Sequence, residues 1–305
     1  MKATAALARA LGFCVWGCVN FQPTLTHAAP PYLEIYQRAT NEFACAEYFK
    51  PAETKTSTNE LSFALAPLIL QQVSVAPEPP SLLDRFGTLS VSNGAPVLDQ
   101  SRPTIYWGSD TVQVNRRPHA RFFYVWCYSP GPQAALLMQG IRITLNSDGQ
   151  PVIWEVLADG SGAKVLFVSQ NLEAAALAEF GKLLPRRRYA IERNAEAAPE
   201  VIVARVIDDG PIPMGPIVYL SAGSRPVSTL ICRCMPAQAR KLLATSTYDL
   251  VPFQEASTNS LIMQARVMLG ERAGFWPGDD TGGKGLEACL RLPKVFSSSR
   301  GAIAR

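Results

Sequence analysis

The stretch Arg121-Phe-Phe-Tyr-Val-Trp-Cys-Tyr128 decides the expected fold, because its side chains alternate between two apolar faces. Successive residues of a strand point to opposite sides of a sheet. One face would carry Phe122, Tyr124, Trp126 and Tyr128, and the other Phe123, Val125 and Cys127. A strand that is apolar on both sides is typical of a sheet centre covered on both faces. The aromatic face is therefore expected in a core, with a ligand platform as the alternative.

Strand and turn signals surround this central strand. Strand residues on both sides of Asn93-Gly94 predict a hairpin over 88–98. A second hairpin is expected from strands at 104–107 and 111–114. Further on, strands are expected at 141–145, 151–157 and 164–169, followed by a helix at 171–180, and then at 188–192, 201–207, 217–222 and 227–234, followed by a helix at 236–244. We therefore predict an α+β fold with a mixed, mostly antiparallel sheet and two meander-plus-helix units, at 141–181 and 188–245.

Before residue 76 the pattern changes to a helical one. The spacing of apolar residues predicts a helix over 32–50. A capping box at Ser57-Thr-Asn-Glu60 introduces an apolar run over 61–73, which Pro67 should kink or split. We expect a helical N-terminal arm here. The expected organisation is a signal peptide at 1–28, the helical arm at 29–75, a Pro-rich linker at 76–85, an α+β domain at 86–250 and a C-terminal helical and loop extension at 251–305.

Composition places the chain among globular proteins and removes one class of partner. The 305 residues are 48% hydrophobic and 18% charged, which is ample for a sizeable core. The formal net charge is only +4. A near-neutral chain of this size offers no electrostatic basis for binding nucleic acid.

The first 28 residues have the features of a secretory signal. Lys2 and Arg9 provide positive charge, and an uncharged apolar run follows at 10–19. Thr26-His27-Ala28 then offers small residues at the two positions that a signal peptidase inspects. We predict export to the periplasm or the exterior. The apolar run is shorter than the ~20 residues needed to span a bilayer, so no transmembrane span is expected in the mature chain. Alternatively, Val15-Trp-Gly-Cys18 resembles a lipobox, which would make the protein a lipoprotein tethered to the membrane through Cys18.

Five cysteines remain after the leader, and an odd number permits at most two disulfides. They are Cys45, Cys127, Cys232, Cys234 and Cys289. Cys232-Arg233-Cys234 ends a predicted strand, and a helix is expected to start at Pro236. A helix N-terminus favours a thiolate, so Cys234 is a candidate nucleophile with Cys232 as its resolving thiol. The alternative is that both cysteines are structural.

His119 is the only histidine outside the leader, and it is the candidate base for such a thiol. An ordinary strand histidine is the alternative. Cofactors and metals are not expected. Gly278-Asp-Asp-Thr-Gly-Gly-Lys284 fits a phosphate loop only in part, because Gly285 stands where Ser or Thr should hold magnesium. Two cysteines without a nearby third ligand make a poor metal site.

No catalytic motif survives this inspection. The adjacent carboxylates of Asp208 and Asp209 precede Gly210-Pro211, and neighbours on a turn diverge, so they do not form the pair that glycoside chemistry needs. We therefore expect a non-catalytic exported protein that binds a partner protein or a small ligand. The alternative is a thiol-dependent oxidoreductase or hydrolase centred on Cys232-Arg233-Cys234.

Overall fold

The computed structural model describes residues 31–40, 46–53, 60–72, 85–93, 95–128, 136–161, 163–185, 187–193, 201–210, 212–221, 226–233, 244–253 and 286–297. Strands dominate these residues, and the helices are short. The helices are α1 (Pro31–Ala39), α2 (Leu61–Ala64), α3 (Gln170–Phe180), α5 (Leu286–Cys289) and the 3-10 helix η4 (Lys294–Ser297). The strands are β1 (Ala46–Pro51), β2 (Leu68–Gln72), β3 (Thr88–Ser92), β4 (Ala95–Asp99), β5 (Thr104–Val114), β6 (Arg117–Tyr128), β7 (Leu137–Leu145), β8 (Pro151–Leu157), β9 (Lys164–Ser169), β10 (Val201–Ile207), β11 (Ile217–Leu220), β12 (Val227–Ile231) and β13 (Ala244–Pro252).

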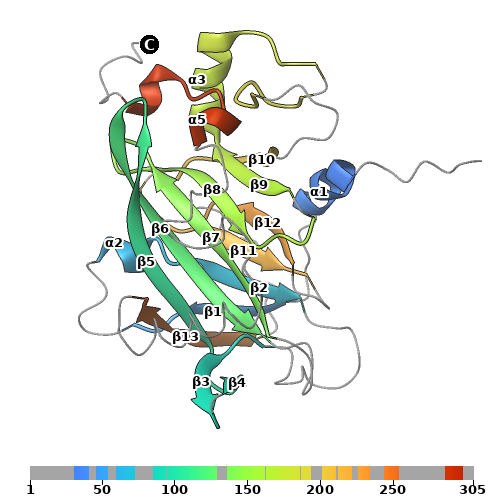
Figure 1. Cartoon of the computed structure of the whole chain (residues 1–305), viewed down its shortest axis with the longest axis vertical. Coiled ribbons are helices and arrows are strands. Elements are labelled where there is room, and N and C mark those ends of the chain that lie inside the picture. The colour runs from blue at the N-terminus through green and yellow to red at the C-terminus, as the bar shows by residue number, and fades with distance from the viewer. Residues whose placement is uncertain are drawn as a thin grey trace, which may run out of the picture.

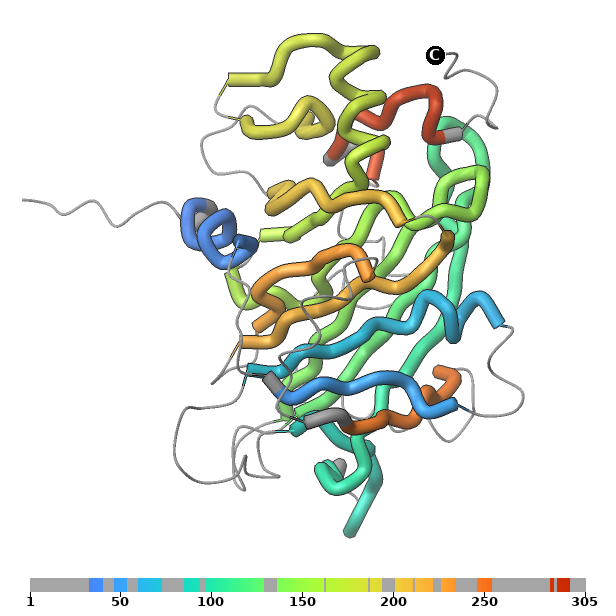
Figure 2. The backbone as a smooth tube through the Cα atoms, turned by 180° about the vertical axis from the view of Figure 1, so that it is seen from behind, coloured from blue at the N-terminus to red at the C-terminus, as the bar shows by residue number. Residues whose placement is uncertain are grey.

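One sheet of eleven strands makes up the body of the molecule, in the order β10-β9-β8-β7-β6-β5-β13-β1-β2-β11-β12. It curls into a nearly closed, barrel-like shape, as Figures 1 and 2 show from opposite sides. Side chains from all eleven strands meet in a single buried cluster, among them Phe49, Trp126 and Ile202. A flat sheet could not bring β1 and β10 into one core, so this cluster is the concave interior.

The expected α+β class is wrong, and so is a mostly antiparallel sheet. The antiparallel run from β5 to β9 is flanked by parallel pairs: β9 with β10 on one side, and β5 with β13 on the other. β13 also runs parallel to β1, and β2 runs parallel to β11. Strands from the two ends of the chain lie side by side here, and their directions follow from tertiary assembly rather than from hairpins.

The helical N-terminal arm is also wrong. α1 ends at Ala39, and residues 46–50, expected to be the end of the helix over 32–50, instead lie in β1. α2 is a single turn that ends before Pro67, and residues 68–72 continue as β2. Proline disfavours the helical conformation of the residue before it. Beyond Pro67, β2 gains a ladder on each side, from β1 and from β11, and these ladders outweigh a weak local preference for helix.

The first meander-plus-helix unit exists as a set of elements, but the second does not. β7, β8 and β9 pair in succession and α3 follows. β10 instead pairs with β9, while β11 pairs with β2 and β12, so β10 and β11 are not neighbours. Residues 188–192 form no strand, because the Glu192 carboxylate accepts the amides of Arg188 and Tyr189 and closes a turn. The helix expected at 236–244 falls on residues outside those described, apart from Ala244, which begins β13.

Two hairpin predictions had different outcomes. The hairpin over 88–98 is confirmed as β3 and β4, with Ser92 paired to Ala95. The expected hairpin at 104–114 is wrong, because β5 continues through Gly108. A Cβ at this glycine would lie 2.3 Å from the Phe123 ring, so Gly108 lets two strands pack closely instead of turning the chain. The turn comes after β5 instead, at residues 115–116, where both φ angles are positive.

Helix α1 covers the seam between the two edge strands, β10 and β12 (Figure 2). The Thr229 hydroxyl of β12 donates to the Ala39 carbonyl at 2.5 Å, and Arg205 of β10 reaches the same carbonyl at 3.4 Å. Arg205 also donates to Thr229 at 3.4 Å, so the two edges are linked directly as well. Ile35 is buried in the interior cluster. The helix thus completes the core where the ladder stops.

Candidate functional site

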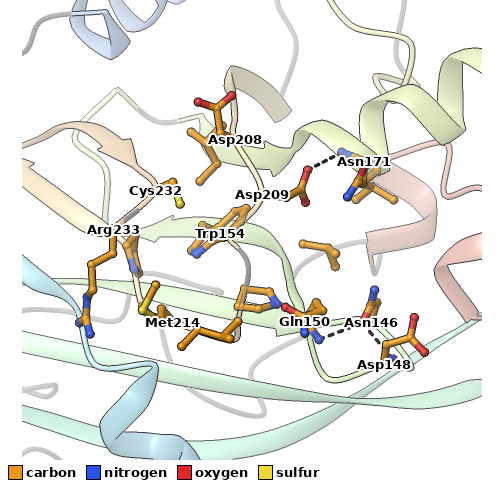
Figure 3. Close-up of a pocket in the computed structure, with 18 of the residues that line it drawn as sticks. Asn146, Asp148, Gln150, Trp154, Asn171, Asp208, Asp209, Met214, Cys232 and Arg233 are labelled. Carbon is orange, nitrogen blue, oxygen red and sulfur yellow. Dashed lines mark hydrogen bonds between the residues drawn. The ribbon is translucent and has the colours of Figure 1, made fainter. Parts of the chain in front are cut away.

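A cavity of about 440 Å³ lies at one end of the curled sheet. Its walls come from the turn before β8 and the start of β8, the ends of β10 and β12, the first turn of α3, η4 and residues 208–210 and 212–216 (Figure 3). Apolar side chains from both the interior cluster and the outer cluster under α3 contribute to the lining. They include Trp154 and Ile207 from the former and Leu172 and Phe296 from the latter.

The turn before β8 places a carboxylate at the cavity. The Asn146 side-chain oxygen accepts the amides of Asp148 and Gln150, each at 2.9 Å. Gly149 takes a positive φ of 75°, a conformation that glycine adopts without steric cost. Asn146 is thereby engaged in its own turn. Asp148, which also lines the cavity, is held with its side chain exposed.

A second carboxylate is tied to the N-terminus of α3. Ser169 caps the helix, its hydroxyl accepting the Leu172 amide at 3.2 Å, and Asp209 accepts the Asn171 amide at 2.8 Å. The helix thus begins at Gln170, one residue before the start expected from the sequence. A carboxylate is well placed here, because the N-terminal amides lack partners within the helix and the helix dipole is positive at this end.

Asp208 precedes this capping residue and points another way, as Figure 3 shows. It is exposed and lines the cavity. Within the part of the chain that the structure describes, its carboxylate has no hydrogen-bond or ion-pair partner. The divergence expected for neighbouring aspartates on a turn is therefore seen, and it leaves one carboxylate structural and the other available.

Trp154 is a deeply buried polar member of the lining. The side chain is only 5% exposed, and its indole nitrogen Nε1 finds no acceptor among the described residues. A buried N–H without a partner costs about 1–3 kcal/mol in the folded state. The backbone of Trp154 is fixed in β8, where it pairs with Ile143 on one side and Phe167 on the other.

Arg233 is the cation of the described lining, but it is directed elsewhere. Its guanidinium donates to the Ala66 carbonyl, and Figure 3 shows the side chain extending away from Asp208 and Asp209. Burial lowers the pKa of Arg233, and the nearby tyrosines Tyr248, Tyr48 and Tyr124 oppose that shift. The guanidinium of Arg233 is therefore directed toward the segment just after α2 and not into the cavity.

The structure places the three predicted catalytic residues differently. Cys232 lines the cavity, and Cys234 is outside the described residues. His119 is buried in β6, where Nδ1 lies 3.1 Å from the Leu145 carbonyl oxygen and burial lowers its pKa. It does not line the cavity. Its ring lies 4.6 Å from that of Phe296, which does, so His119 supports the wall from behind.

Cys127 shows what a structural cysteine looks like in this protein. The thiol is free and fully buried in β6, and burial raises its pKa to about 12. At neutral pH it therefore remains a protonated thiol, and the thiol form is not the nucleophile. This agrees with the interpretation of buried free cysteines as small apolar residues.

The comparisons with protein-family models, with curated proteins and with solved structures found no match for this chain. None of the described helices is long and apolar enough to cross a membrane. Among the described side chains, no group of three or more His, Cys, Asp or Glu residues is placed to hold a metal ion. The cavity geometry is therefore the main guide to function.

Sequence reasoning had singled out Cys232 and the Asp208-Asp209 pair, and both lie at this cavity. Sequence reasoning missed Trp154, because in the sequence it looks like one more apolar strand residue. It also missed Asp148, because that residue looks like an ordinary part of a turn. No local signal marks either of them, because the cavity exists only where the ends of β8, β10 and β12 converge.

Proposed function

We propose that this protein is a non-catalytic binding protein whose cavity takes a small organic molecule with an apolar body. The observation that carries the proposal is the cavity itself. Its volume of about 440 Å³ lies within the range of small-molecule sites, roughly 300–1,000 Å³. Apolar walls with a few polar groups, at the mouth of a nearly closed, barrel-like sheet, are typical of such sites.

The rigidity of the surroundings supports binding by a preformed site. Trp154, Ile207 and Ile231 sit on strands whose backbones are fixed by ladders, and Leu172 sits on a capped helix. A preformed cavity saves the ordering cost that a flexible site would incur on binding.

Thiol chemistry has less support among the described residues, because His119, the candidate base, does not line the cavity beside Cys232. The thiol hypothesis then rests on Cys234, which lies outside the described residues.

A fluorescence titration tests the binding proposal. N-phenyl-1-naphthylamine is a neutral dye that becomes fluorescent in apolar surroundings, and we expect saturable binding to the purified protein. Ile212 lines the cavity and is 58% exposed, so Ile212→Trp should obstruct the cavity. We expect it to weaken dye binding about tenfold, which corresponds to about 1.4 kcal/mol of binding free energy. Leu177→Trp is the matched control, because Leu177 is 50% exposed on α3 and does not line the cavity.

Two results would count against the proposal. One is the absence of saturable dye binding to the natural protein. The other is equal weakening by both tryptophan variants, which would locate the dye elsewhere or indicate general damage to the fold.

The proposal includes export, on the strength of the leader-like segment at 1–28. The expected product is a mature chain that starts near Ala29 and is found in the periplasmic or secreted fraction. Intact mass spectrometry of each cell fraction measures this directly. A diacylglycerol adduct on Cys18 in the membrane fraction would instead establish the lipoprotein alternative, and a full-length cytoplasmic chain would contradict both.

A further inference from the structure

The charges around the cavity are one-sided. Three carboxylates line it, from Asp148 in the turn before β8 and from Asp208 and Asp209 after β10. Among the described lining residues the opposing cation is Arg233, whose guanidinium is hydrogen-bonded to the Ala66 carbonyl. A cleft lined by one sign of charge concentrates the field and raises the local concentration of ions of opposite sign.

Two of these carboxylates are free to meet a ligand. Asp209 uses one oxygen to cap α3. For Asp148 and Asp208, the described part of the chain supplies no cation and no hydrogen-bond donor to the carboxylate. Their charges are thus neither neutralised by an ion pair nor dispersed over backbone amides.

The cavity wall adds a second feature that suits a cation. The indole of Trp154 forms part of the lining and is the aromatic ring that attracts organic cations most strongly. Its N–H is buried without an acceptor among the described residues; because it can only donate, it would meet a hydrogen-bond acceptor elsewhere on the ligand and not the ammonium group. Apolar contacts from Ile231, Leu172 and Phe296 complete the surroundings for a carbon chain or ring.

Resting on the proposed function, we infer that the cavity selects organic amines: molecules with an apolar body and one protonated or quaternary ammonium group. The carbon body lies against Ile231, Leu172 and Phe296. The ammonium group lies in the field of Asp208 and Asp148, which Figure 3 shows apart from each other at the border of the cavity, and a charge-assisted contact forms with whichever carboxylate it meets. A carboxylate in place of the ammonium would be repelled by the same residues.

A matched series of probes tests this selection. Octylamine, octanol and octanoate each have eight carbons, and at pH 7 their head groups are cationic, neutral and anionic. Displacement of N-phenyl-1-naphthylamine should rank octylamine first, about three- to tenfold ahead of octanol, with octanoate last. The advantage of octylamine over octanol should shrink as salt rises, because salt screens partly exposed charges.

Substitutions identify the responsible carboxylates. Asp208→Asn and Asp148→Asn should each reduce the advantage of octylamine over octanol, because loss of the carboxylate charge weakens octylamine binding more than octanol binding. Asp249→Asn is the control, since Asp249 is an exposed aspartate on β13 that does not line the cavity. It should leave the whole series unchanged.

The outcomes separate this inference from the proposal beneath it. Equal binding of octylamine and octanol, or tightest binding of octanoate, would overturn the selection of amines and leave a binding cavity in place. Failure of all three probes and of the dye would overturn the binding function itself, and the inference with it. An octylamine advantage that survives in the Asp208→Asn, Asp148→Asn double variant would also overturn it.

Discussion

At the scale of single residues, the buried ion pair of Arg142 and Glu155 shows how this sheet tolerates charge. The two residues face each other across β7 and β8, and the guanidinium donates to both carboxylate oxygens, at 2.7 and 3.0 Å. Their side chains are 4% and 2% exposed. Burial opposes ionisation of Glu155, but the charge and hydrogen bonds of Arg142 outweigh it and lower the pKa of that carboxyl. Both residues therefore stay charged at neutral pH.

Removing one partner of this pair should be costly. Glu155→Gln leaves the Arg142 charge buried without a counter-charge, and we expect a loss of about 3–5 kcal/mol in the free energy of unfolding. Replacing both residues by methionine should cost much less, because no uncompensated charge remains. Urea denaturation measures each value.

An exposed pair provides the comparison for this prediction. Arg102 and Asp249 are 3.6 Å apart with side chains 66% and 53% exposed, so Asp249→Asn should change stability by less than about 1 kcal/mol. A Glu155→Gln effect as small as this would show that water reaches the Arg142 side chain.

At the scale of elements, α1 links the two edges of the large sheet although it has only nine residues. Ladders link every neighbouring pair of strands except β10 and β12, which are the two edges of the sheet. α1 bridges them with backbone carbonyls as well as apolar side chains. Ser228 donates to the Arg38 carbonyl at 3.0 Å, next to the bond from Thr229 to Ala39, and the Arg38 side chain forms an ion pair with Asp159 at 2.7 Å.

Weakening this bridge should open the seam without unfolding the sheet. Thr229→Val removes the hydroxyl that meets the Ala39 carbonyl and contacts Arg205, and we expect it to lower stability by about 1–3 kcal/mol. Hydrogen exchange should speed up in β10 and β12 and stay unchanged in β6 and β7, because local opening follows local contacts.

A matched variant controls for the loss of a threonine hydroxyl. Thr88→Val removes a comparable bond, at 2.8 Å to the Arg102 carbonyl, in the β3–β4 hairpin. It should leave exchange in β10 and β12 unaffected. Uniformly faster exchange in the Thr229→Val variant would show that the seam does not open on its own.

At the scale of the whole molecule, stability should depend on pH through His119. Burial lowers its pKa below the ordinary value of 6.5, so the folded state binds the proton less readily than the unfolded chain. As pH falls below about 6.5, the unfolded chain is protonated first and the folded state loses stability. Above that pH the contribution is fully present.

The contribution of Glu192 to stability has the opposite pH dependence, and the experiment has to separate it from that of His119. Burial raises its pKa above 4.5, so its contribution is lost as pH rises past that value. We therefore compare the free energy of unfolding at pH 7.5 and 5.5 for the natural protein and for His119→Gln. The loss of stability on acidification should be smaller in the variant. An equal loss in both would show that another group is responsible.

The sequence by itself determined those elements of this protein that pair or pack with their neighbours along the chain. Alternation over 121–128 predicted which side chains of β6 face each side of the sheet, and the structure puts Tyr124, Trp126 and Tyr128 in the interior cluster and Phe123, Val125 and Cys127 in the outer one. The Asn93-Gly94 signal predicted a hairpin that is present. The strands and helix of 141–180 were also predicted closely, because each pairs or packs with its neighbour in sequence.

Only the tertiary structure decided the closure of the sheet and the cavity. β1 and β13 lie side by side although Glu47 and Ser246, which are hydrogen-bonded at 3.1 Å, are 199 positions apart. Nothing in either segment marks such a partner, since parallel pairing between distant strands has no turn to encode it. Residues 46–50 were predicted as part of a helix for this reason. Trp154, Asp148 and Asp208 became a site in the same way, because distant strand ends converge there and side chains that are ordinary in the sequence come to share one cavity.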